Sequence, residues 1–166
     1  MAAVSSFDVT STVDLQEVDN AVNQARKEIA QRYDFKGSTA SIDFNKAEST
    51  LTLAAEDQMK INALWDVLQT RMVRRNVPIK NLKLGDIEPA GGSSVRRVIT
   101  LQQGIPGDAA REIIKFLKDQ KLKKVQASIQ GDQLRISSAS KDELQDVIRL
   151  LRGQDFGIAL QFGNYR

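Results

Sequence analysis

The sequence of 166 residues contains neither cysteine nor histidine. The lack of cysteine excludes disulfide bonds, thiolate nucleophiles and thiolate metal ligands, and the lack of histidine removes the side chain most used as a general base or metal ligand. Because most enzyme mechanisms need one of the two, we expect no catalytic activity, no metal and no cofactor. A carboxylate-dependent reaction or a Mg²⁺ site built from Asp and Glu remains open, but no acidic cluster points to it.

Long apolar runs are also missing, since charged residues interrupt every hydrophobic stretch well short of the about 20 residues that cross a membrane. The start of the chain, Met1–Ser6, lacks the basic residues and the apolar stretch of a secretory signal peptide. We therefore expect a cytoplasmic protein without membrane attachment.

The common phosphate-binding and nucleophile motifs do not occur. The sequence has no G-x-x-x-x-G-K-[ST], no G-x-G-x-x-G after a predicted strand and no G-x-S-x-G. Nucleotide binding by this chain would thus follow neither the P-loop nor the Rossmann pattern.

What is present is the composition of a globular protein, with 41% hydrophobic and 27% charged residues. The net charge is +3, and the positive excess lies after Ala90, where 13 basic residues face 8 acidic ones. A basic field attracts polyanions, although an excess of this size is common in proteins that bind none.

Hydrophobic periodicity predicts the order β-α-β-β-α-β in the first half of the chain. Apolar residues three and four positions apart follow a capping-box-like start at Ser11–Asp14, and a second such stripe follows the predicted cap Asp57. The first stripe is Leu15, Val18, Val22, Ala25 and Ile29, and the second is Ile61, Leu64, Leu68 and Met72. The predicted strands are Phe7–Thr10, Ser38–Phe44, Thr50–Ala54 and Ile79–Leu84.

The same order recurs after a stretch rich in Pro, Gly and Ser, Ile87–Ser94. Its strands are Val95–Leu101, Lys124–Gln130, Gln133–Ser137 and Ile158–Phe162, and its helices carry Ala110, Ile113, Ile114 and Leu117, then Leu144, Val147, Ile148 and Leu151. Ala40-Ser41-Ile42 and Ala127-Ser128-Ile129 open the two hairpins alike. We infer an internal duplication, with one unit at residues 1–88, a linker at 89–94 and a second unit at 95–166.

Each β-α-β-β-α-β unit is the ferredoxin-like arrangement of the α+β class, in which two helices cover one face of an antiparallel sheet and leave the other face open. In the second half, Val125, Ala127, Ile129, Leu134 and Ile136 are predicted to face the core. The residues predicted on the open face are Lys124, Gln126, Ser128, Gln130, Gln133, Arg135, Ser137 and Gln161, with Arg96 and Thr100 from Val95–Leu101. Amides and cations suit a nucleotide, but a solvated sheet surface has the same pattern.

Two further basic groups have both a structural and a functional interpretation. Arg71, Arg74 and Arg75 end the second predicted helix, and five lysines run from the third helix into the next strand: Lys115, Lys118, Lys121, Lys123 and Lys124. Cations at helix C-termini are stabilised by the helix dipole. The lysine run is the better functional candidate, because it leads onto the polar face. The outward strand positions carry no aromatic residue, so RNA contacts would need charge or the loop aromatics Tyr33, Phe35, Phe156 and Tyr165.

Four segments together resemble the YajQ-like bacterial family over essentially the whole chain. They are Ser6–Val9, Tyr33–Lys36, Lys124–Asp132 with the following Arg135, and Gln161–Arg166. The resemblance implies two ferredoxin-like domains that exchange their first strands, so that strand 6–10 joins the second sheet and strand 95–101 the first. Asp8 and Thr10 would then replace Arg96 and Thr100 on the second open face.

The resemblance also implies a nucleotide-binding protein without catalysis, for which cyclic di-GMP, GTP, ATP or RNA would be the ligand. The residues that we expect to bind it are Lys36, Lys124, Gln126, Gln130, Arg135, Asn164 and Arg166. The alternative is an adaptor in bacterial regulation that docks onto a protein such as a transcription factor and whose docking is modulated by nucleotide. Exposed Trp65 or Phe35 would serve such an adaptor.

Overall fold

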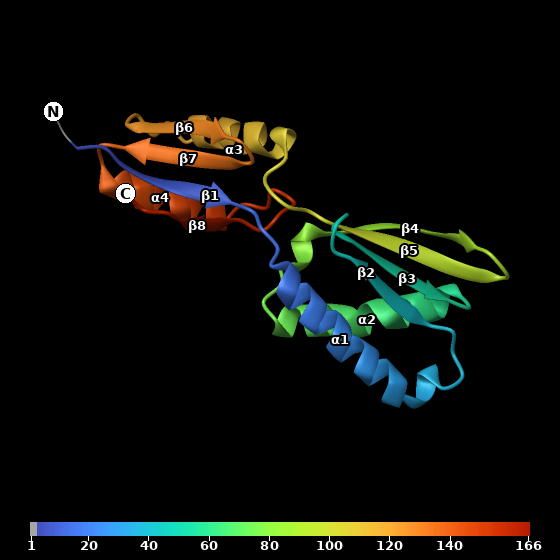
Figure 1. The fold of residues 1–166 in the computed structure, drawn as a ribbon. Helices are drawn as coiled ribbons and strands as arrows, with labels where there is room; N and C mark the ends of the chain where they lie inside the picture. The colour runs from blue at the N-terminus through green and yellow to red at the C-terminus, as the bar shows by residue number, and fades with distance from the viewer. Residues whose placement is uncertain (1–2) are drawn as a thin grey trace. The chain divides into compact units, whose positions relative to one another are not determined.

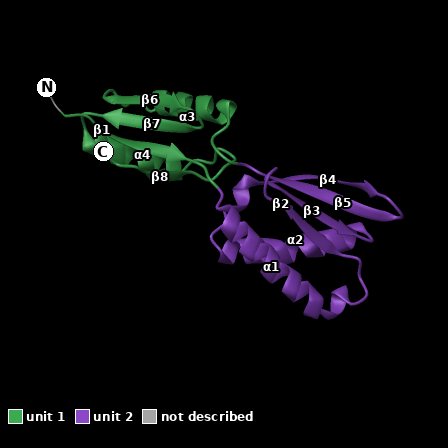
Figure 2. Ribbon diagram, in the orientation of Figure 1, with its two compact units in different colours: residues 1–12, 103–166 green, residues 13–102 purple. Residues whose placement is uncertain are grey.

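The computed structural model describes residues 3–166 and divides the chain into two compact units (Figures 1 and 2). Unit 1 consists of the N-terminal segment up to Thr12 together with Gln103–Arg166, and unit 2 is Val13–Gln102. Each unit has a four-stranded antiparallel sheet and two α-helices. The predicted α+β class and the repeated ferredoxin-like order are confirmed.

The sheet of unit 1 has the strand order β6-β7-β1-β8. Its strands are β1 (Ser5–Thr10), β6 (Val125–Gln130), β7 (Gln133–Ser138) and β8 (Gln161–Gly163), and its helices are α3 (Gly107–Asp119) and α4 (Lys141–Arg152). Phe7 and Val9 of β1 and Leu134 and Ile136 of β7 are completely buried in one cluster with the apolar sides of both helices. Because side chains alternate along a strand, the residues between them face away from the helices.

The sheet of unit 2 has the order β2-β3-β5-β4. Its strands are β2 (Ser41–Asn45), β3 (Thr50–Ala55), β4 (Leu82–Ala90) and β5 (Ser94–Leu101). Helices α1 (Leu15–Gln31) and α2 (Gln58–Arg74) cover one face, and the 3-10 turns η1 (Tyr33–Phe35) and η2 (Ile79–Asn81) complete the unit (Figure 1). Asp14 and Asp57 cap α1 and α2, accepting hydrogen bonds from backbone N–H groups of the first turn.

The two halves of the sequence exchange their first strands, as the resemblance implied. β1 pairs with β7 and β8 of the C-terminal half, whereas β5 pairs with β3 and β4 of the N-terminal half. The stretch 89–94, which we expected to be a linker, lies in the hairpin of β4 and β5, where Pro89 is opposite Val95 and Ala90 is opposite Ser94. The compact units are therefore not consecutive halves of the chain.

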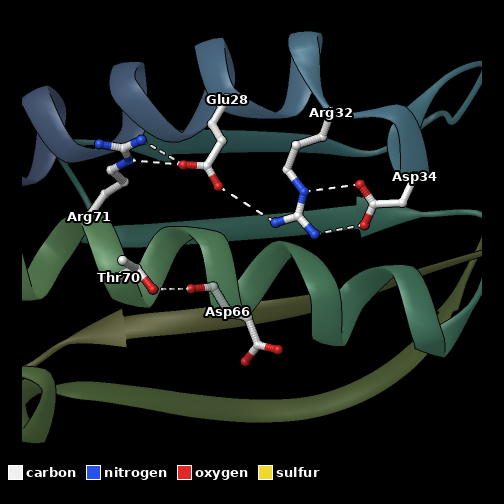
Figure 3. A network of polar contacts seen from close by, with 6 residues as sticks. All are labelled: Glu28, Arg32, Asp34, Asp66, Thr70 and Arg71. Carbon is white, nitrogen blue, oxygen red and sulfur yellow. Dashed lines mark hydrogen bonds and ion pairs between the residues drawn. The ribbon is translucent and has the colours of Figure 1, made fainter.

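The arginines at the end of α2 join this helix to α1. The guanidinium of Arg71 donates two hydrogen bonds, of 3.2 and 2.6 Å, to Glu28, whose other oxygen lies 3.5 Å from Arg32 (Figure 3). Arg32 in turn binds both carboxylate oxygens of Asp34, and Arg75 pairs with Glu17 at 3.2 Å. Arg71 and Arg75 therefore have a structural role, since they connect α2 to α1.

Several sequence-based details were wrong. Ile79 does not begin a strand, because a 3-10 turn with a hydrogen bond from the Asn81 N–H to the Pro78 carbonyl precedes β4. The last strand begins at Gln161, since Ile158 fills the core without pairing to β1. Ile129 is 51% exposed, because it lies near the end of an outer strand.

The loop aromatics also differ from expectation, since Phe35 and Phe156 are buried in the cores of their units. Trp65 is only partly exposed and packs against the core of unit 2. Tyr33 and Tyr165 remain exposed. None of the helices within residues 3–166 is both long and apolar enough to cross a membrane.

Candidate functional site

The face of the unit 1 sheet that points away from the helices carries rows of polar side chains across its strands. The register places Asp8 of β1 directly opposite Arg135 of β7 and Gly163 of β8, with Ser128 of β6 beyond Arg135. Gln126 lies opposite Ser137 in a neighbouring row. The strand exchange thus places the Asp8 carboxylate in the middle of this face. The amides and cations around it come from the second half of the sequence.

Asp8 binds three of the residues that the sequence nominated. Its Oδ1 accepts a hydrogen bond of 3.0 Å from Nε of Arg135, and its Oδ2 accepts one of 2.7 Å from Nδ2 of Asn164. A terminal nitrogen of Arg166 lies 3.8 Å from Oδ2. The main chain of Arg166 is held as well, because its N–H and carbonyl both pair with Ser6. Arg135, Asn164 and Arg166 therefore form one cluster.

The carboxylate is ionised over the whole physiological range. The hydrogen bond from Arg135, then that from Asn164, and the positive charges of Arg135 and Arg166 lower the pKa of Asp8 below its ordinary 3.8, against the opposing effect of burial. The three charged side chains of the cluster, one carboxylate and two guanidinium groups, have a formal charge of +1 in total.

Both arginines keep donors for a further partner. Arg135 uses Nε for Asp8, and its two terminal nitrogens make no hydrogen bond within residues 3–166. The guanidinium of Arg166 interacts with Asp8 through its charge alone, because the 3.8 Å between its terminal nitrogen and Oδ2 of Asp8 is longer than a hydrogen bond. The side chains of Arg135 and Arg166 are 38% and 48% exposed. A guanidinium that is fixed by a carboxylate on one side and open on the other is suited to bind phosphate oxygens.

A depression of about 370 Å³ adjoins the carboxylate. It is lined by Asp8, Thr10, Gln133, Gln161, Phe162, Gly163 and Asn164. Gly163 forms part of its floor, and a Cβ on this residue would have no atom within 4 Å, so the missing side chain leaves open space next to Asp8. The side chain of Gln133, which lines this depression, has no hydrogen-bond partner among the described residues.

Gln161 has a structural role at the rim. Its Oε1 accepts hydrogen bonds from the Thr12 N–H at 2.9 Å and from the hydroxyls of Thr10 and Thr12, and its Nε2 donates to the Thr12 carbonyl. These bonds fasten the end of β1 to β8.

The other nominated residues of unit 1 lie away from the cluster. Gln126 and Gln130 are exposed on the open face of the outer strand β6, and Nε2 of Gln130 donates to the Ser128 hydroxyl. Lys124 directly precedes β6 and is exposed. No described contact connects these three residues to Asp8.

Lys36 belongs to the other unit and follows the turn η1. Here Phe35 is 5% exposed, with Arg32 and Lys60 over its ring at 5.3 and 5.1 Å from the centroid. The Lys60 ammonium also donates to the Asp34 carbonyl. A separate depression of about 500 Å³ is lined by Lys36, Arg26 and Phe35, among others.

Comparison with known proteins assigns the chain to a family. The model of the family described as nucleotide-binding protein YajQ-like matches residues 5–166. The chain belongs to this family.

YajQ-like relatives match the chain almost from end to end. A nucleotide-binding protein of Koribacter versatilis is 51% identical over 99% of this chain and 98% of its own length. One of Solibacter usitatus is 50% identical over 98% and 97%, and one of Chloroherpeton thalassium is 47% identical over the full length of both chains.

In this YajQ-like protein, the sequence did not nominate Asp8, Gln133 or Gly163 as site residues. Two signals marked Asp8: it is a charged residue between the apolar Phe7 and Val9 in a predicted strand, and the strand exchange implied by the resemblance places it on the second open face. Its partner Arg135 could not be recognised without the strand exchange. Within residues 3–166, no group of three or more acidic side chains is placed to hold a metal ion.

Proposed function

We propose that this YajQ-like protein binds a small nucleotide in the depression beside Asp8 and catalyses no reaction. The curated relatives are named nucleotide-binding proteins, and a volume of about 370 Å³ is within the range of small-molecule sites. The observation that carries the proposal is the Asp8 cluster, in which Arg135 and Arg166 keep unused donors while Asp8 and Asn164 line this depression.

Different residues of the site bind different parts of the nucleotide. Arg135 and Arg166 bind phosphate oxygens by charge-assisted hydrogen bonds. The unpartnered amide of Gln133 and the carbonyl oxygen of Asn164 present a donor or an acceptor to the edge of a base. Asp8 is a positioning residue, because its two oxygens hold Arg135 and Asn164 in place.

A small nucleotide such as cyclic di-GMP, GTP or ATP fits this face better than RNA does. Proteins that bind single-stranded RNA stack its bases on aromatic side chains. Among the described residues, the outward positions of β1, β6, β7 and β8 carry hydroxyls, amides, charges and a glycine. Tyr165 is exposed in the C-terminal tail, but its ring lies against Phe7 with 6.1 Å between centroids.

The state of Asp8 supports binding without catalysis. A general base must be able to take up a proton near the working pH. The pKa of Asp8 is held below 3.8, and both of its oxygens already accept hydrogen bonds.

The test is isothermal titration of nucleic-acid-free protein with cyclic di-GMP, GTP, ATP and a short RNA, at low and at moderate salt. We expect one small nucleotide to bind at both salt concentrations. Arg135→Gln should weaken this binding by about tenfold or more, since a hydrogen bond to a charged group contributes about 1.5–3 kcal/mol. Arg149→Gln is the matched control, because Arg149 is 76% exposed on α4 of the same unit.

Three results would contradict the proposal. They are equal affinity of the Arg135→Gln variant and the wild type, binding of RNA alone with a steep loss in salt, and turnover of a bound nucleotide. Arg135→Lys separates folding from recognition, since it keeps the charge opposite Asp8 but loses the forked donors.

A protein-interaction adaptor whose docking is modulated by nucleotide is the alternative function. One observation favours it, namely that the side chains of the lysines at the end of α3 have no described partner, unlike Arg71 and Arg75 at the end of α2. An adaptor should change its affinity for a partner when nucleotide is added.

A further inference from the structure

A second concave surface of unit 1 is lined by residues from the end of α3, from the turn that follows it and from the outer strand β6. Its volume is about 670 Å³. Aliphatic side chains form its floor: Ile114, Leu117, Leu122, Val125 and Ala127. Lys118, Lys121 and Lys123 stand around it. We call this surface the α3–β6 groove.

One wall of the α3–β6 groove is the edge of a sheet. Strand β6 pairs with β7 and is the outermost strand in the order β6-β7-β1-β8. The N–H and carbonyl groups along the free edge of such a strand can pair with an added strand. Ile129 continues the line of Val125 and Ala127 along β6 and is 51% exposed, so the apolar surface extends past the groove along the same edge.

The charge around the groove is not neutralised. Lys118, Lys121 and Lys123 line it, and Lys115 and Lys124 are sequence neighbours of the lining residues Ile114 and Val125. None of these five side chains takes part in a hydrogen bond or ion pair within residues 3–166. Glu112 and Asp119 lie on the same helix, but neither is within 4.0 Å of a lysine ammonium. The groove therefore presents uncompensated positive charge beside an apolar floor.

We propose that the α3–β6 groove binds an extended, acidic segment of a partner protein, which adds to β6 as a further strand. Aliphatic side chains of this segment cover Val125, Ala127 and Ile129, and its carboxylates meet the lysines of α3 and of the following turn. The floor argues against single-stranded nucleic acid, since it offers aliphatic groups rather than the aromatic rings on which bases stack. This inference does not depend on nucleotide binding at Asp8.

The first experiment measures fluorescence anisotropy with labelled peptides of about six residues, the usual length of a strand. One peptide library alternates Asp or Glu with Val, Ile or Leu, and a control library has Lys at the acidic positions. We expect members of the acidic library alone to bind, with an affinity that falls as salt is added. Lys118→Gln/Lys123→Gln should weaken binding about fivefold or more.

Lys27→Gln/Lys46→Gln is the matched control, because it removes the same charge from exposed lysines of unit 2. It should leave peptide affinity unchanged, as should Arg135→Gln. Conversely, the Lys118→Gln/Lys123→Gln variant should still bind nucleotide. Failure of this inference is thereby distinguishable from failure of the proposed function.

A second experiment tests the strand addition without altering the protein. The best peptide is made with N-methyl groups on alternate residues, in two versions that block either one edge of the strand or the other. Pairing to β6 uses a single edge of the peptide, so one version should bind and the other should not.

Equal binding of both N-methylated versions would overturn the strand addition. Absence of binding throughout the acidic library would overturn the proposal as a whole. So would binding of a labelled oligouridylate, but of no peptide, that is lost in Lys118→Gln/Lys123→Gln.

Discussion

At the scale of single residues, the open face of unit 1 is organised around a carboxylate that is 4% exposed although it points away from the helices. The polar side chains of Arg135, Asn164 and Arg166 account for its burial, since they gather around it. A charge in this position is stable because each oxygen has a donor and the nearest charges are positive.

This arrangement predicts an acid-sensitive contribution to stability. Because the folded protein lowers the pKa of Asp8, the contribution is complete above the ordinary value of 3.8 and is lost as the pH falls below 3.8 through the folded pKa. Asp8→Asn should lower the free energy of unfolding by about 1–3 kcal/mol near neutral pH, and this difference should shrink below pH 3.8. Urea unfolding of both proteins across this range measures it, and a difference that does not change with pH would contradict the role of the charge.

Gly163 gives a second prediction at this scale. Its φ is outside the left-handed region, and a Cβ there would contact nothing within 4 Å, so Gly163→Val should fold normally. The added side chain fills the depression beside Asp8, and nucleotide affinity should therefore fall by about tenfold or more. Calorimetric titration together with a thermal melt checks both parts. A variant that keeps full affinity would place the ligand elsewhere.

At the scale of elements, two glycines in the hairpin of β4 and β5 differ in whether the structure has room for a side chain. The pairing of β4 with β5 shifts between Leu84 and Ile87, and a Cβ on Gly85 would lie 2.8 Å from the carbonyl oxygen of Val98. That oxygen belongs to the backbone of the central strand β5 and cannot move aside. The bulge in β4 therefore requires a residue without a side chain.

Gly85→Ala should accordingly destabilise unit 2 by about 1–3 kcal/mol, the usual cost of overpacking. Gly91→Ala, in the turn of the same hairpin, is the matched control, since a Cβ there meets no atom within 4 Å. Chemical unfolding of both variants gives the comparison. Equal stabilities would mean that the backbone of β4 relaxes around the methyl group.

At the scale of the whole molecule, the strand exchange determines which parts of the chain can fold alone. Unit 2 is continuous, Val13–Gln102, whereas the core of unit 1 requires Phe7 and Val9 from the N-terminus. The fragment 95–166, which corresponds to the second half of the sequence repeat, lacks β1 and includes β5 of the other sheet.

We expect the fragment 13–102 to fold and the fragment 95–166 to remain unfolded. Joining the segment that ends at Thr12 to Gln103 through a short glycine-serine linker should restore folding of unit 1, because the Gly104 N–H donates to the Ser11 carbonyl at 2.6 Å and the two ends are close. Dispersion of amide signals in NMR spectra distinguishes the cases. A folded fragment 95–166 would show that β5 can replace β1.

The sequence by itself determined the features that depend on local periodicity. Alternation along Lys124–Ser137 correctly placed Arg135, Gln126 and Gln130 on an open face, and the helical stripes together with Asp57 defined α1 and α2. Boundaries without a periodic signal, such as the start of β8, were not predicted correctly.

Local sequence pattern did not decide which strand lies next to β7: the family resemblance implied the exchange, and the tertiary structure shows it. Pairing there joins Asp8 to Arg135, residues 127 positions apart in the chain, and no spacing in the sequence distinguishes β1 from β5 as the neighbour. Phe7 and Val9 of β1 flank the polar Asp8, and Ile99 and Leu101 of β5 flank the polar Thr100, so local pattern supports either pairing. The choice is made by the burial of Phe7 and Val9 against α3 and α4, and it brings Asp8, Arg135, Asn164 and Arg166 together.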